Sequence, residues 1–391
     1  MAALSLRRLS NPENLQKIDP RNLAALLHPH QAYFARRGIA IPPPGSPNVH
    51  LDHASLVQVF LAPDREMPLD LVESLHIVNE LASPSGMDAL LEAAREQEIA
   101  IGRLRTATPL DVAVRACLQD RAFVESVHQR HALLKTHGYT YFTATGPAAA
   151  LNPVPEAALD ALRRDLDDYY AEHNRGRHCR IHVFHRGGKT WFTVRHGDAF
   201  KRAVDIETKP AAIFTYRPEC FSTMVYVAES GELGIHASSK RELDLYRKLM
   251  GRHFFGFEEF FCGPGRFTLA PLLTKGPASL ACSDVSGIEW VKLVEVRYER
   301  ALPNHPREIR CASDLFDSYP HGIVPSDARL LGAGFKMKFR GARGARRLGL
   351  YPPNEARHSR EGDAVLTEQW LQARGFLRPQ AETGADVSCG N

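Results

Sequence analysis

The sequence predicts an α+β protein, with an amino-terminal all-helical domain followed by a larger, mainly antiparallel β domain with covering helices. Three observations predict this class. The segments before about residue 137 have the apolar spacing of amphipathic helices. Residues 180–196 alternate in the manner of a β-hairpin around Gly187 and Gly188. The strand-like runs that follow are too closely spaced for crossover helices, which favours antiparallel pairing.

The helical domain is predicted over residues 1–143. Residues 70–82 place Leu71, Leu75 and Val78 on one helical face. Further on, Ser85 is a plausible cap of one helix and Thr108 of another, since a serine or threonine oxygen can accept a hydrogen bond from a free backbone N–H. We expect this domain to bind a protein partner or to self-associate.

A segment rich in Pro, Gly and Ala at 144–156 marks the boundary, so the second domain is expected over 144–378. Its first helix is predicted over 155–173, directly before the hairpin. The residues after Pro379, 379–391, are expected to form a disordered tail.

The hairpin at 180–196 has two chemically different faces. A primed two-residue turn at the glycine pair sets Arg186 opposite Lys189 and Phe184 opposite Trp191. One face is then apolar and predicted to be core: Ile181, Val183, Phe192 and Val194. The other face carries two aromatic side chains among cations: Arg180, His182, Phe184, Arg186, Lys189, Trp191, Thr193 and Arg195. Such a surface suits stacked bases and phosphates.

The rest of the chain extends the antiparallel domain. Strands are predicted over 211–217, 221–228, 232–237, 278–282 and 291–299. A helix should begin after Ser239, because Ser239 and Glu242 form a capping box. A second basic hairpin is predicted over 334–354, and it carries Lys336, Lys338, Arg346 and Arg347. A final helix should end at Gly375.

Composition limits the class of protein. The net charge of +4 permits a polyanionic partner without requiring one. There is no apolar run long enough to cross a bilayer and no signal-peptide pattern, so we expect a cytoplasmic protein without a membrane partner. Seven scattered cysteines indicate reduced thiols, and the preference for arginine over lysine suggests a GC-rich bacterial genome. Phosphate-binding P-loop, Rossmann, hydrolase-elbow and HExxH motifs are lacking.

These features predict a nucleic-acid-binding accessory protein, and a bacterial defence or mobile-element system is one hypothesis for its setting. Phe184 and Trp191 would stack bases. The phosphates would meet cations from both hairpins: Arg180, Arg186, Lys189, Arg195, Lys336, Lys338, Arg346 and Arg347.

Two alternatives remain. Asp198, Glu207 and Lys209 follow the order of an Mg²⁺-dependent nuclease of the PD-(D/E)xK kind, in which two carboxylates hold the metal and the lysine activates water. The leading proline of that pattern is missing. The other alternative is a non-catalytic scaffold subunit of a protein complex. Outside the nuclease hypothesis no cofactor is expected, because strand alternation splits the histidines near Cys179 between two faces.

Overall fold

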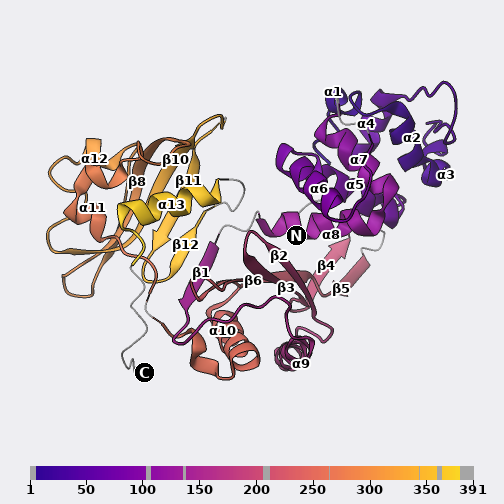
Figure 1. Cartoon of the computed structure of the whole chain (residues 1–391). Coiled ribbons are helices and arrows are strands. Elements are labelled where there is room, and N and C mark those ends of the chain that lie inside the picture. Colours follow the sequence, from indigo (N-terminus) through magenta and orange to yellow (C-terminus); the bar gives the residue numbers. More distant parts are fainter. Residues whose placement is uncertain are drawn as a thin grey trace. The chain divides into compact units, whose positions relative to one another are not determined.

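The computed structural model describes residues 6–102, 107–134, 138–205, 212–263, 265–342, 344–358 and 363–378. The chain forms two compact units, Met1–Lys135 and Thr136–Asn391. The first is helical, and the second combines a 10-stranded antiparallel sheet with helices, so the predicted α+β class is confirmed (Figure 1). The predicted tail, 379–391, lies outside the described residues.

The amino-terminal unit is built from short helices around one apolar core. The predicted core residues Leu71, Leu75 and Val78 are fully buried in it. Its helices are α1 (Pro12–Leu15), α2 (Pro20–Leu27), η1 (His28–His30), α3 (Gln31–Ala35), α4 (His53–Leu61), α5 (Leu69–Leu81), α6 (Pro84–Glu96), α7 (Pro109–Gln119) and α8 (Arg121–Leu134). Thr108 caps α7 as predicted. The cap of α6 is Ser83 rather than Ser85, because Pro84 suits the first helical position, where no N–H is needed.

The second unit contains a sheet with the order β2-β3-β6-β7-β1-β12-β11-β10-β8-β9. The strands are β1 (Gly138–Thr143), β2 (Arg180–Arg186), β3 (Lys189–Gly197), β6 (Glu219–Val227), β7 (Glu232–His236), β8 (Ile288–Arg300), β9 (Arg307–Cys311), β10 (Ala328–Phe339), β11 (Arg346–Tyr351) and β12 (Glu355–Arg357). A separate 2-stranded ribbon pairs β4 (Lys201–Asp205) with β5 (Ala212–Tyr216).

Two expectations for this unit need correction. The boundary expected after residue 143 comes too late, because β1 pairs with β7 and β12 inside the sheet. The strand expected over 278–282 is largely replaced by the 3₁₀ helix η3 (Gly276–Leu280), which begins with a glycine and a proline that do not suit a central strand.

The helices of this unit are α9 (Glu156–Glu172), α10 (Lys240–Phe255), η2 (Glu258–Phe261), α11 (Ala270–Thr274), α12 (Leu315–Ser318) and α13 (Ala364–Arg374). The predicted hairpin core face, with Ile181 and Phe192, packs into one cluster with Leu162 of α9 and Leu249 of α10. Helix α10 begins as predicted, with Ser239 as its cap.

Helices cover opposite faces of the two halves of this sheet. Helices α9 and α10 pack on the face that carries Ile235 of β7. In the other half, Trp370 of α13 packs on Phe335 of β10. Residues directly opposite each other in an antiparallel ladder have their side chains on the same face of the sheet. Thr140 lies opposite both Ile235 and Glu355, so Glu355 is on the same face of the sheet as Ile235, which α10 covers. Phe335 lies on the other face, so each half has one side covered by its own helices (Figure 1).

Candidate functional site

The first hairpin has the predicted register. All seven pairs from Arg180↔Arg195 to Arg186↔Lys189 are present. On its polar face, however, the aromatic pair Phe184 and Trp191 is not freely open to solvent. Trp191 is only 5% exposed and stacks in parallel on the half-buried Phe184, with 5.7 Å between ring centroids. A base would have to displace neighbouring atoms to reach the indole ring.

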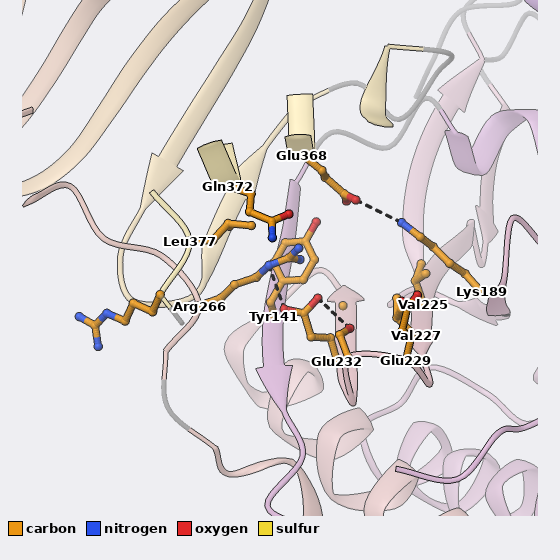
Figure 2. A pocket seen from close by; sticks show the side chains of 13 residues that line it. Tyr141, Lys189, Val225, Val227, Glu229, Glu232, Arg266, Glu368, Gln372 and Leu377 are labelled. Carbon is orange, nitrogen blue, oxygen red and sulfur yellow. Dashed lines mark hydrogen bonds and ion pairs between the residues drawn. The ribbon is translucent and has the colours of Figure 1, made fainter. Parts of the chain in front are cut away.

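The cations of this hairpin are in different settings. Arg195 forms an ion pair with Glu219, while Arg180 is exposed beside it. Burial and these two neighbouring guanidinium groups lower the pKa of His182. Lys189 instead lines a pocket, where its ammonium nitrogen lies 3.5 Å from a carboxylate oxygen of Glu368 (Figure 2).

The second hairpin also forms, with β10 paired to β11. Lys336 lies directly opposite Arg347, so these two cations share a face, and Lys338 is on the same face two residues along β10. Arg346 belongs to the other face, because it lies opposite the buried Met337. Its guanidinium pairs with Asp363, 2.7 Å away at the start of α13.

The two predicted hairpin surfaces point to opposite sides of the sheet. The register Trp191↔Val225, Val225↔Gly234 and Gly234↔Tyr141 places the first hairpin's aromatic face on the side that α13 covers in the other half. Lys336 and Arg347 lie on the reverse side. The two sets of cations therefore do not form one continuous surface.

A larger basic surface surrounds Lys336 and Arg347, and we call it the basic face. It is made by the outward side chains of β8–β12: Trp290, Lys292, Glu295, Arg297, Glu299, Arg307, Ile309, Cys311, Arg329, Lys336, Lys338, Arg347, Tyr351, Glu355 and Arg357. Arginines dominate its exposed area, and Arg347 has 70% of its side chain exposed. Most of this surface could not be predicted from the sequence, because β12 has only three residues and the β8–β10 pairing contains bulges.

Two carboxylates of the basic face are each shared between two arginines. Glu295 lies 2.8 Å from Arg297 and 3.4 Å from Arg347. Likewise, Glu299 lies 3.2 Å from both Arg307 and Arg329. One carboxylate cannot neutralise two guanidinium groups, so an excess of positive charge remains.

Tyr351 lies flat at the centre of this face because glycines make room for it. A Cβ atom at Gly332 would come within 2.5 Å of the ring, and one at Gly349 within 3.0 Å. Arg297 and Arg357 make cation–π contacts over the ring, with their guanidinium carbons 5.1 Å and 4.8 Å from its centroid. An aromatic ring among cations on the outward side of a sheet is typical of surfaces on which bases stack.

The nuclease residues are only partly described. Asp198 accepts a hydrogen bond of 2.8 Å from the Ala199 N–H, and its carboxylate lies 3.1 Å from the Lys201 ammonium group. These two interactions lower the pKa of Asp198. Glu207 and Lys209 lie outside the described residues. Among the residues that are described, no group of three or more histidine, cysteine or acidic side chains is arranged to hold a metal ion.

A comparison with protein-family models found no match, and one with curated protein sequences also found none. Within the described part of the chain, each helix is too short or too polar to cross a membrane.

Proposed function

We propose that this protein binds single-stranded nucleic acid through the basic face. The proposal rests mainly on two shared carboxylates. Glu295 and Glu299 each form ion pairs with two arginines, so the surface keeps a net positive charge. Phosphate neutralisation by such clustered cations supplies most of the affinity in nucleic-acid binding. Of the cations expected from the sequence to contact phosphate, Lys336, Lys338 and Arg347 belong to this face.

The aromatic side chains of the surface favour single strands. Tyr351 lies flat against the sheet beside Gly332, and Trp290, farther along β8 opposite Lys338, is 37% exposed. Unstacked bases can lie on such rings, whereas the bases of a duplex are already stacked on one another. The first hairpin has a lesser role in this proposal, because Trp191 is buried and its face is on the reverse side of the sheet.

Fluorescence anisotropy with labelled single-stranded DNA and RNA over a salt series tests the proposal. Log affinity should fall linearly with log salt, and Lys336→Ala with Arg347→Ala should reduce the slope by up to about 1.4, at about 0.7 for each phosphate contact. Tyr351→Ala should cost about 1–3 kcal/mol of binding free energy if a base stacks there.

Arg177→Ala is a matched control, since Arg177 is an exposed arginine paired with Asp168 of α9, away from the basic face. It should bind like the wild type. Binding that does not depend on salt, or equal losses in Arg177→Ala and in the double variant, would refute the proposal.

A further inference from the structure

A pocket of about 720 Å³ opens on the side of the sheet opposite the basic face. It lies where α13 stops covering the sheet, with walls from β1, β3, β6 and β7 on one side and from α13 on the other (Figure 2). This volume is typical of pockets for small molecules. Neither basic hairpin predicts it, because its walls come from segments far apart in the sequence.

Two ion pairs line this pocket. Glu232 of β7 lies 2.9 Å from Arg266, and both side chains are nearly buried. Lys189 and Glu368 form the second pair, which joins β3 to α13 at 3.5 Å. Figure 2 shows the two pairs in the same pocket. Each pair offers a ligand one carboxylate and one cation.

Arg266 is held in position independently of any ligand. Its guanidinium carbon lies 4.4 Å from the ring centroid of Tyr141 and 5.4 Å from that of Phe267. The Ser230 hydroxyl donates a hydrogen bond of 3.3 Å to Glu232. Both charged groups of the inner pair are thus oriented before a ligand arrives, which lowers the entropy cost of binding.

The ion pair with Arg266 only partly offsets the cost of burying the negative charge of Glu232. Burial raises its pKa even though Arg266 opposes the shift, and the Glu368 carboxylate in the same pocket raises it further. A cationic group placed between these carboxylates would relieve both effects. Val225, Val227 and Leu377 form an apolar part of the remaining wall, and Glu229, Gln372 and Arg378 form its polar part.

We propose that this pocket binds a free α-amino acid with an apolar side chain. Its ammonium group would lie against Glu232 and its carboxylate against Arg266, antiparallel to that ion pair, while the side chain would cover Val225 and Val227. A zwitterion matches the two signs of charge and brings no net charge into the pocket. This site is independent of the basic face.

The test is differential scanning fluorimetry of the full chain with each of the twenty free amino acids, followed by calorimetry on those that bind. At least one apolar amino acid should raise the melting temperature. Its amine without the carboxylate, its acid without the amino group, and AMP and GMP should not. No binding by any amino acid, equal binding by the amine alone, or binding by the nucleotides instead would each overturn the proposal.

Variants locate the site. Glu232→Gln should weaken amino-acid binding about tenfold to a hundredfold, as expected for the loss of a charged hydrogen bond. Glu368→Gln tests the same pocket at a more exposed position if Glu232→Gln fails to fold, and it should also weaken binding. Arg347→Ala on the basic face should leave binding unchanged. Wild-type affinity in Glu368→Gln, or a loss in Arg347→Ala, would contradict the assignment.

Discussion

Replacing Glu295 with glutamine should strengthen nucleic-acid binding. Glu295 is on β8 with its side chain 15% exposed, and its carboxylate lies between Arg297 and Arg347. Its Cβ also covers Gly334, since a Cβ atom added there would lie 2.9 Å away. Glutamine keeps this shape and removes only the charge. Both guanidinium groups then become available to phosphates.

The magnitude follows from the two arginines that are released. If each gains one phosphate contact, the slope of log affinity against log salt should become steeper by up to about 1.4, at about 0.7 for each contact with a single strand. The stability cost should be small, at most about 1 kcal/mol, because the side chains of Arg297 and Arg347 are 41% and 70% exposed and ion pairs of exposed groups contribute little.

The assay is anisotropy of labelled single-stranded oligonucleotides at several salt concentrations, with urea unfolding to confirm that Glu295→Gln remains folded. Asp168→Asn is the matched control, because it removes a carboxylate that pairs with the exposed Arg177 on another surface. The reasoning is refuted if Glu295→Gln binds no more tightly than the wild type at low salt, or if Asp168→Asn gains as much affinity.

Three further predictions concern stability and reactivity. Trp191→Ala should lower the free energy of unfolding by about 3–5 kcal/mol because the indole is buried, as urea denaturation will show; a loss below about 1 kcal/mol together with weaker oligonucleotide binding would support base stacking instead. Burial raises the pKa of Glu232 above its ordinary value of 4.5, so the stability linked to its protonated form is present below about pH 4.5 and is lost as the pH rises through the folded-state pKa. As the pH rises through this pKa, Glu232→Gln should therefore lose less stability than the wild type. Denaturant titrations at several pH values measure this difference, and an equal pH dependence in the two proteins would show that Glu232 does not cause it. Burial and Asp167 raise the pKa of Cys179 to about 12, whereas Cys311 is exposed. Iodoacetamide at neutral pH should alkylate Cys311 first, as peptide mass spectrometry can follow, and faster labelling of Cys179 would show that its surroundings open.

Local signals in the sequence were sufficient for several elements. The glycine pair 187–188 determines the register of the first hairpin, because only a primed turn matches the twist of its two strands. Ser239 marks the start of α10 because its hydroxyl accepts a hydrogen bond from a free backbone N–H. In contrast, the apolar run at 278–282 has no periodicity that separates a strand from a short helix, and most of it is η3.

The candidate sites depended on information that is not local. Both basic hairpins were identified from the sequence. However, alternation along one strand does not determine to which side of the whole sheet its polar side chains point. That side depends on the pairings of β1 with β7 and β12, and even the nearest of the paired residues, Thr143 and Glu232, are far apart in the chain. The burial of Trp191 also could not be predicted from the sequence, because it depends on which residues pack around the strand.

The sequence by itself determined the fold class, most of the strands and helices, and the presence of two basic hairpins, since these follow from turns, caps and periodicities within a few residues. Only the tertiary structure decided that the hairpins face opposite ways, that Arg297 and Arg357 contact the ring of Tyr351, and that Glu232 and Arg266 share a pocket with Lys189. Each of these arrangements joins residues distant in the chain through the order and register of the strands. Such pairings are chosen by the packing of the whole sheet rather than by any one segment.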